Sequence, residues 1–325
     1  GFFTFSASSL LTYANISNMT LTNTSSMFNM YQANTAGGPY LTEIVIKNTR
    51  IVKDSPMNNF FADKALVEID VGGFILEGGH NWSGMFDGCA NLKTIKGMDK
   101  IDWTKITNIS NMFRNSGITA VPSGMETADL SNATDISQAF NYCGQLETAD
   151  LSGWKISNKA TSIYAMFHMC KKLKSAKIGS IMKSNITNMS QMFVNDTLLE
   201  TVDITGCDTS MVTTANSMFS GCRALQEVNG IDELNLTKCT NVSGMFGNCV
   251  SMTEFNVDKW HLDSVTNCDS MFTNCEKITI LDFSSYNFNK SSSIVFANMC
   301  SGMRNLTTIK LPSYLKGSNF NGMFN

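Results

Sequence analysis

The residues best suited to chemical reactions or metal binding are the ten cysteines. Neighbouring copies of a stacked repeat bring equivalent Cα atoms within disulfide range, so aligned cysteines could form disulfides or bind a metal ion. The alternative is a column of small buried apolar side chains. We favour packing and predict neither a metal site nor a cofactor, because Ser116 and Asp196 replace cysteine in two copies and the sequence has no C-x-x-C pair. Six cysteines share one repeat position, three residues after a phenylalanine: Cys89, Cys143, Cys170, Cys222, Cys249 and Cys275.

Groupings typical of catalysis do not occur in the sequence. His80, His168 and His261 are scattered through the repeat, and no order of serine, histidine and aspartate suggests a triad. The sequence also has no G-x-S-x-G, no H-E-x-x-H and no glycine-rich phosphate loop. We therefore expect a protein that is not an enzyme.

Polar residues alternate with apolar ones in the segments predicted to be strands. The polar residues of these strands would face outward. The simplest interpretation is a solvated sheet face, and the functional one is the ligand surface of a solenoid. Calcium binding is not expected, because the carboxylates are not clustered. The candidate binding residues are Thr148, Asp150, Lys177, Thr201, Asp203, Glu227, Asn229, Glu254, Asn256 and Asp282.

Four residues at another shared repeat position could form an aromatic platform for sugars. That position points inward in repeats of this kind, so we predict core packing instead. The four residues are Trp154, Cys207, Trp260 and Tyr286.

An internal repeat of about 26 residues must position all of these groups. Its marker is a phenylalanine, usually preceded by methionine. The marker phenylalanines are Phe28, Phe61, Phe86, Phe113, Phe140, Phe167, Phe193, Phe219, Phe246, Phe272, Phe296 and Phe324.

Each copy contains a helical pattern followed by a strand pattern. In the copy around Phe246, apolar residues stand at i, i+3, i+4 and i+7, which predicts a helix of about two turns. A preceding Thr-Asn pair would cap it, and a Gly or Asn such as Gly221 or Asn248 would provide a left-handed exit. The strand pattern has the L-x-x-L-x-L spacing of leucine-rich repeats, as in Leu199, Val202 and Ile204.

These patterns predict an α/β solenoid. It would be a leucine-rich-repeat-like right-handed superhelix of about twelve short strand–turn–short helix coils with one parallel sheet. We expect one elongated domain with an N-terminal cap or irregular coil in 1–27, irregular repeats in 28–85, regular repeats in 86–295 and divergent, truncated repeats in 296–325.

Composition limits the class of partner. The net charge of −3 argues against nucleic acid, and no apolar run is long enough to cross a bilayer. We see neither a signal peptide nor a wall anchor, and the motif at Phe324 suggests an open end through which the solenoid could self-associate.

The units resemble the BspA-like bacterial surface-protein repeat. The resemblance rests on the Thr-Asn-apolar-Ser-x-Met-Phe core at Thr107–Phe113, Thr187–Phe193 and Thr240–Phe246, and on the strand that begins at Ala149. It implies a secreted or surface-displayed bacterial protein that binds a host or cell-surface protein or glycan. A structural role in a phage virion fibre or a surface stalk is the alternative.

Overall fold

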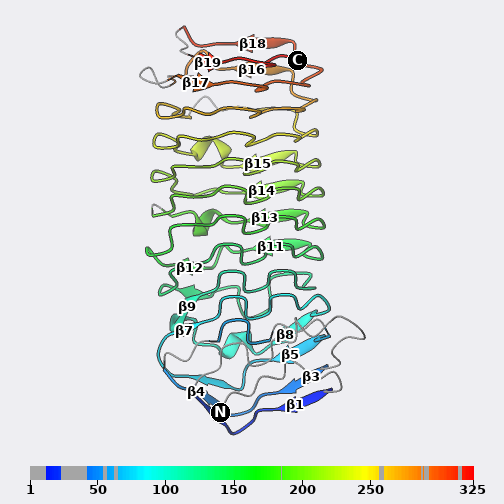
Figure 1. Ribbon diagram of the computed structural model, residues 1–325, viewed down its shortest axis with the longest axis vertical. Helices are drawn as coiled ribbons and strands as arrows, with labels where there is room; N and C mark the ends of the chain where they lie inside the picture. Colours follow the sequence, from blue (N-terminus) through cyan, green and yellow to red (C-terminus); the bar gives the residue numbers. More distant parts are fainter. Residues whose placement is uncertain are drawn as a thin grey trace. The chain divides into compact units, whose positions relative to one another are not determined.

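The computed structural model shows a chain wound into coils whose strands pair in parallel (Figure 1). It forms two compact units, residues 1–160 and residues 161–325. Each unit is a parallel β-solenoid, which confirms the predicted leucine-rich-repeat-like architecture. The structure describes residues 12–22, 42–53, 57–61, 65–183, 185–255, 260–286, 288, 293–313 and 317–325.

Unit 1 carries its strand ladders on different sides of the coil. In Figure 1, β5 and β8 lie on one side and β7 and β9 on the other. All pairings are parallel: β1 (Tyr13–Asn15) with β3 (Glu43–Val45), β2 (Thr20–Leu21) with β4 (Thr49–Ile51) and then β6 (Phe74–Leu76), β5 (Glu68–Asp70) with β8 (Thr94–Lys96), β7 (His80–Asn81) with β9 (Ile106–Asn108), and β10 (Asp129–Leu130) with β12 (Lys155–Ile156). The unit also contains β11 (Thr148–Asp150) and the 3₁₀ turns η2 (Met98–Lys100) and η3 (Trp103–Lys105).

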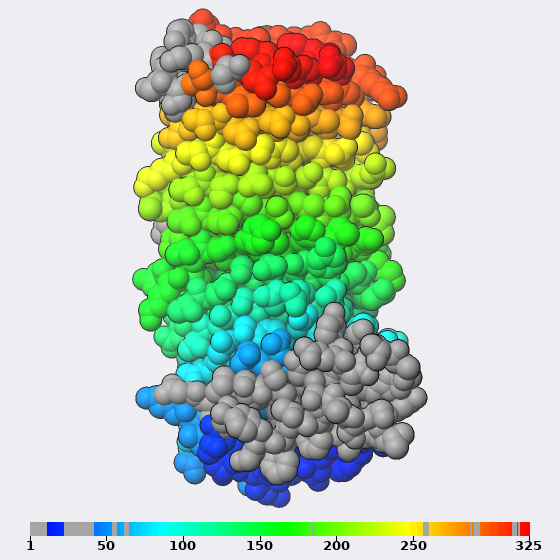
Figure 2. All heavy atoms as spheres, viewed as in Figure 1, coloured from blue at the N-terminus to red at the C-terminus, as the bar shows by residue number. Residues whose placement is uncertain are grey.

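Unit 2 repeats this plan, and its segments follow one another as bands in sequence order (Figure 2). A ladder of three strands joins β13 (Ser175–Lys177), β14 (Thr201–Asp203) and β15 (Glu227–Asn229). Further pairs join β16 (Ile280–Asp282) to β18 (Thr308–Lys310), and β17 (Ile294–Val295) to β19 (Gly317–Asn319). The short helices are η4 (Gly179–Ile181) and η5 (Ile231–Glu233).

In the three strands of the unit 2 ladder, only the central residue points into the core. In the ladder of unit 2, Ala176, Val202 and Val228 are in register and buried. Their neighbours on either side face outward, as the alternation of polar and apolar residues predicts. The predicted strand segments are therefore confirmed.

The segments around the marker phenylalanines are turns and not the two-turn α-helices expected from their apolar spacing. The N–H groups of Val242, Gly244 and Phe246 donate to carbonyls of the next coil, at 3.0, 2.8 and 2.9 Å. The N–H groups of Met245 and Gly247, which directly follow Gly244 and Phe246, donate to carbonyls three residues back along their own coil. An α-helix needs an unbroken run of i to i−4 bonds, and this alternation prevents it.

Left-handed backbone at two positions of each turn also excludes a helix. Gly244 and Asn248, two residues either side of Phe246, have φ of 59° and 64°. The expected left-handed exits at Gly221 and Asn248 are thus confirmed, although they end a turn and not a helix. The Thr-Asn pair likewise serves the turn, because Asn241 Oδ1 accepts from Ser243 N–H at 3.0 Å.

The core of each unit is a column of stacked phenylalanine rings. In unit 2, the ring centroids of Phe193 and Phe219 are 5.5 Å apart with a 3° interplanar angle, and those of Phe219 and Phe246 are 5.3 Å apart. In unit 1, Phe86 and Phe113 stack at 5.7 Å. The expected alignment of the marker rings is confirmed over these coils, and Phe28 lies outside the described residues.

One marker was assigned to the wrong residue. Phe272 N–H donates to Met299 O, just as Phe246 N–H donates to Met271 O, so Cys300 and not Phe296 is the counterpart of Phe272. Phe296 instead occupies the position four residues earlier, where its ring stacks on Phe320 at 5.4 Å. A Val-Phe pair resembles a drifted Met-Phe, and the register becomes clear only from the hydrogen bonds between coils.

Candidate functional site

The best candidate surface is the outward side of the three-strand ladder in unit 2, which we call the strand face. It consists of two rows of side chains, one residue from each strand per row. Lys177, Glu227 and Asn229 are exposed, and the others are half-buried. The rows are Ser175, Thr201 and Glu227, and Lys177, Asp203 and Asn229.

The structure brings together five of the ten residues expected to bind: Lys177, Thr201, Asp203, Glu227 and Asn229. Thr148 and Asp150 are exposed on β11 of unit 1. Glu254 is exposed outside any strand, Asp282 ends β16, and Asn256 lies outside the described residues.

Opposite charges lie one strand apart on the strand face. Hydrogen bonds from the side chain and backbone of Thr205, together with the nearby Lys177 ammonium, hold the pKa of Asp203 below its usual value. Asp203 is therefore ionised at neutral pH beside a cation. This alternation avoids the repulsion that like charges on adjacent strands would cause.

The aspartates at the strand ends also have a structural role that the sequence analysis missed. Oδ1 of Asp150 accepts from Ser152 N–H at 2.8 Å, and Oδ1 of Asp203 accepts from Thr205 N–H at 2.9 Å. Each carboxylate thus closes an Asx turn after its strand. The Asp-x-Ser/Thr spacing is the sequence signal that could have shown it. Alanine at these positions would remove the turn together with the charge, whereas asparagine would remove the charge alone.

Asp282 shows how strongly a cross-strand pair can hold a carboxylate ionised. Its Oδ2 accepts from Lys310 Nζ at 2.7 Å, and Ser284 bonds Oδ1 through its N–H and hydroxyl at 2.9 and 2.6 Å. The Lys310 hydrogen bond, followed by those of Ser284, lowers the pKa of Asp282 to about 2.

We expect the Asp282 carboxyl to titrate near pH 2 in a carbon-detected NMR titration, and Lys310→Met to move its pKa toward the ordinary value of 3.8. Because the folded-state pKa is depressed, the stabilisation exists above pH 3.8 and disappears as the pH falls toward 2. Ser284→Ala is the matched control and should raise the pKa less, since Lys310 contributes most. A wild-type midpoint near 3.8 would contradict this account of the pair.

The cysteine column is buried in the core, which confirms the packing interpretation. All ten cysteines are free thiols, and Cys207 alone among them is partly exposed. Cys249 Sγ donates to Phe219 O at 3.2 Å, and Cys275 Sγ donates to Phe246 O at 3.1 Å. Burial raises the pKa of the Cys275 thiol to about 12, so this thiol is not a ready nucleophile or metal ligand.

The repeat position of Trp154, Cys207, Trp260 and Tyr286 belongs to the core, as predicted, and does not form an aromatic platform. Trp154, Trp260 and Tyr286 are at most 4% exposed, and Cys207 is half-buried. Trp154 Nε1 donates to Met125 O at 2.7 Å, which satisfies its one polar group inside the coil. No surface for a ligand arises at this repeat position.

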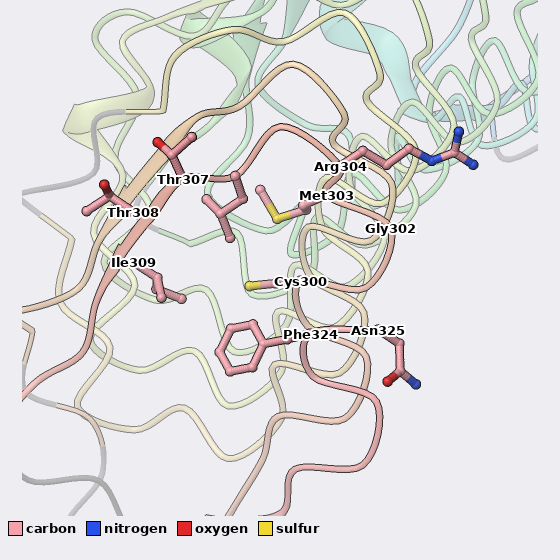
Figure 3. Close-up of a pocket in the computed structure, with 10 residues that line it drawn as sticks. Cys300, Gly302, Met303, Arg304, Thr307, Thr308, Ile309, Phe324 and Asn325 are labelled. Carbon is pink, nitrogen blue, oxygen red and sulfur yellow. The ribbon is translucent and has the colours of Figure 1, made fainter.

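A pocket of about 400 Å³ lies beside β18 at one end of unit 2. Figure 3 shows Cys300, Met303, Ile309 and Phe324 turned toward this space, with Arg304 directed away from it. Phe324 is 57% exposed, so an apolar ring meets solvent here. The pocket offers an apolar surface next to a strand, and it contains no carboxylate.

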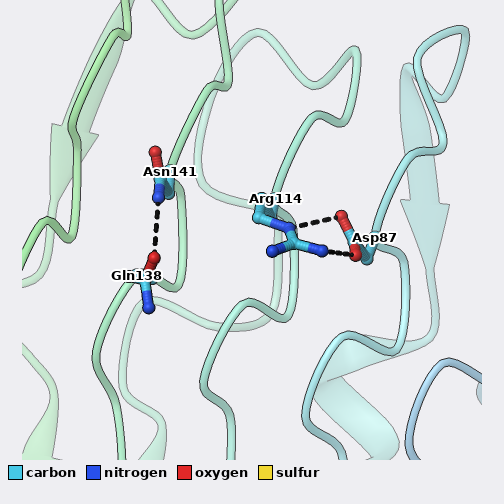
Figure 4. A network of polar contacts seen from close by, with 4 residues as sticks. All are labelled: Asp87, Arg114, Gln138 and Asn141. Atoms are coloured by element: carbon cyan, nitrogen blue, oxygen red, sulfur yellow. Dashed lines mark hydrogen bonds and ion pairs between the residues drawn. The ribbon is translucent and has the colours of Figure 1, made fainter.

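Polar side chains directly follow the marker phenylalanine in three successive coils of unit 1, at Asp87, Arg114 and Asn141 (Figure 4). Arg114 forms a bidentate ion pair with Asp87 of the preceding coil. Asn141 Nδ2 donates to Gln138 Oε1 at 2.9 Å. The next residue along the chain, Tyr142, is 47% exposed and borders a hollow. Sequence analysis missed Tyr142, although its aromatic side chain departs from the Gly and Asn found at that position in most copies.

Two searches of the described residues complete this picture. No group of three or more His, Cys, Asp and Glu side chains among them could hold a metal ion. No helix in the described part of the chain is long and apolar enough to span a membrane.

Several solved structures are similar to this chain. A leucine-rich repeat protein from Bacteroides ovatus is 17% identical with a TM-score of 0.34, over 85% of this chain and 78% of that one. Another from Eubacterium ventriosum is 16% identical with a TM-score of 0.34, over 82% and 84%. A leucine-rich cell surface protein from Faecalibacterium prausnitzii is 12% identical with a TM-score of 0.27, over 94% and 88%.

Family membership rests on sequence. No curated protein matches this chain. The profile of the family DUF285, described as "Mycoplasma protein of unknown function", matches residues 3–118, 80–200 and 161–286. These overlapping matches cover most of the chain and follow the repeat from coil to coil. The chain therefore belongs to the DUF285 family.

Proposed function

We propose that this protein is a non-enzymatic recognition module of the BspA-like kind, which binds a protein partner through the strand face of unit 2. One observation carries the proposal: three adjacent strands present polar side chains of both charges in two ordered rows. Stacked repeats commonly bind their partners through such extended sheet surfaces.

The pattern of charges favours a protein over a small ligand. Small-molecule sites are concave and mainly apolar, whereas the strand face presents Lys177 and Glu227 as exposed charges on separate strands. A protein surface with the complementary arrangement could pair with both. Such pairing determines the orientation and the association rate of a complex more than its raw affinity.

A location at the cell surface or outside the cell is part of this proposal. It is supported by the resemblance of the repeat to BspA-like surface proteins and by a polarity that depends on Asn, Ser and Thr more than on charge, since only 16% of residues are charged. Free cysteines do not oppose it, because nine of the ten thiols are buried in the core and protected from oxidants.

The test is an array of host cell-surface protein ectodomains probed with the full chain. We expect the triple variant Lys177→Met, Asp203→Asn and Glu227→Gln to lose at least about tenfold in affinity, because 1.4 kcal/mol of lost charge pairing corresponds to that factor. Asparagine at position 203 keeps the turn acceptor, so the fold should be retained.

A matched control removes the same charges elsewhere in unit 2, by Lys238→Met, Asp263→Asn and Glu276→Gln. This control should bind as the wild type does. Equal binding by wild type and the strand-face variant would reject the strand face as the site.

A further inference from the structure

A hollow of about 430 Å³ opens on the surface of unit 1, and its lining includes no residue of the strand face. Its volume falls in the range of small-molecule sites. It spans three consecutive coils, those of Phe86, Phe113 and Phe140. The residues that line it include Gly88, Ala90, Asn115, Tyr142, Gly144 and Gln145.

The hollow is bordered by a repeat position that carries small residues in three successive coils, two of which, Ala90 and Gly144, line it. Four residues after the marker stand Ala90, Gly117 and Gly144. The same position in unit 2 carries larger side chains, including Lys171 and Arg223. A Cβ added to Gly144 would meet no heavy atom within 4 Å, so the space beside it is open.

Tyr142 borders this hollow in an unfavourable backbone conformation. Its φ is 59°, in the left-handed region, where bulky residues are rare. Most equivalent positions carry Gly or Asn, as at Gly221 and Asn248, which adopt this region more easily, and Met169 is the other bulky residue there. Tyr142 is 47% exposed, and backbone strain at a bulky residue is characteristic of functional sites.

The chemistry of the lining indicates a neutral ligand with hydroxyl groups. Tyr142 offers an exposed ring, and the exposed side chains of Asn115 and Gln145 offer amide donors and acceptors. No charged side chain lines the hollow. Asp87 and Arg114, which precede the lining residues Gly88 and Asn115 in the sequence, are paired with each other (Figure 4).

We propose that this hollow is a carbohydrate subsite that binds a neutral sugar ring. The apolar C–H face of the sugar stacks on Tyr142, and its hydroxyl groups bond the amides of Asn115 and Gln145. An aromatic side chain with an apolar face and a polar tip is suited to a ligand of this mixed character. A cation would find no carboxylate in the lining and an anion no ammonium or guanidinium group.

Two variants test the subsite without endangering the fold. Tyr142→Asn removes the ring and places a residue that tolerates the left-handed region, so it should melt at or above the wild-type temperature. Gly144→Lys fills the hollow with the side chain that Lys171 carries at the equivalent position. Gly144 is not among the residues with positive φ, so lysine fits its backbone.

The probes are the methyl glycosides of glucose, galactose, mannose and N-acetylglucosamine, observed by saturation-transfer NMR with the full chain. We expect at least one to bind the wild type, and both variants to weaken that binding at least about tenfold. Met169→Asn is the control, because it relieves a left-handed residue at the equivalent position of unit 2, with φ of 65°, and should leave binding unchanged.

Either of two results would overturn the proposal. One is the absence of binding of all four glycosides to the wild type. The other is binding that Tyr142→Asn and Gly144→Lys leave intact while both variants remain folded by circular dichroism. Neither result bears on the strand face, because its residues lie in unit 2.

Discussion

Replacement of Phe219 by alanine is expected to destabilise unit 2 by about 3–5 kcal/mol, the usual cost of removing a buried phenylalanine ring. Phe219 is fully buried, and its ring stacks on Phe193 at 5.5 Å and on Phe246 at 5.3 Å. Both neighbours lose a stacking partner, so the cavity weakens three coils together. Hydrogen exchange monitored by mass spectrometry should show faster exchange in the coils of Phe193, Phe219 and Phe246 before the rest of unit 2.

Leu198→Ala provides the control for this experiment. Leu198 lies in the same part of unit 2 but is 47% exposed, so its truncation should change stability by no more than about 0.5 kcal/mol. In a solenoid each coil contacts only its neighbours, and stability is nearly a sum of local terms. Faster exchange spread evenly over all of unit 2 after Phe219→Ala would contradict that description.

Replacement of Asp196 by cysteine is expected to stabilise the protein by about 1–3 kcal/mol at neutral pH, the usual cost of an unsatisfied buried polar group. Asp196 is fully buried at the position where Cys222 and Cys249 stand in later coils. Its Oδ1 accepts from Cys170 N–H at 2.7 Å, but Oδ2 has no hydrogen-bond partner among the described residues. Cys170 N–H also donates to Phe167 O, so it keeps a partner in the variant.

The gain from Asp196→Cys should depend on pH. Burial raises the pKa of Asp196 well above its ordinary value of 3.8. Below pH 3.8 the folded and unfolded chains both hold the proton, so the carboxyl has no pH-linked effect on stability. As the pH rises above 3.8, the unfolded chain releases its proton and the folded chain keeps it, so the wild type loses stability until the folded-state pKa is passed.

Urea unfolding at pH 4 and pH 8 would measure this dependence, with a larger advantage for Asp196→Cys expected at pH 8. The control is Asp208→Asn. Hydrogen bonds from Ser210 lower the pKa of Asp208, which is exposed, so its contribution has the opposite sign and its loss should cost stability at pH 8. An equal advantage for Asp196→Cys at both pH values would contradict the buried neutral carboxyl.

Much of this fold can be predicted from the sequence, because the repeat shows which side chains point inward. The alternation at Thr201, Val202 and Asp203 gives both the strand and its outward face. The marker rings and the cysteine column follow from the periodicity, since residues that recur at one position of a stacked repeat form one column. The five residues brought together on the strand face were all predicted in this way.

The remaining details depend on hydrogen bonds between coils, which a single copy of the repeat does not reveal. Apolar residues at i, i+3, i+4 and i+7 face one side of a helix, and they also face one side of a tight series of turns. A left-handed residue two positions after the marker, such as Asn248, is compatible with the end of a helix. Only a second left-handed residue before the marker, such as Gly244, distinguishes the series of turns from a helix. Tyr142 stands at an exposed turn position, which neither the apolar spacing of the turn nor the alternation of the strand distinguishes.

The carbonyl groups that accept from each turn belong to the adjacent coil, which means that one coil is interchangeable with another at the level of the main chain. Recombination between two copies of the gene segment would add or remove a whole rung and leave every remaining donor with an acceptor. Length can therefore vary in evolution without a new core, while each added rung brings a new pair of outward side chains to the surface. Such a scaffold can diversify its surface by changing how many rungs it has, and not only which residues they carry.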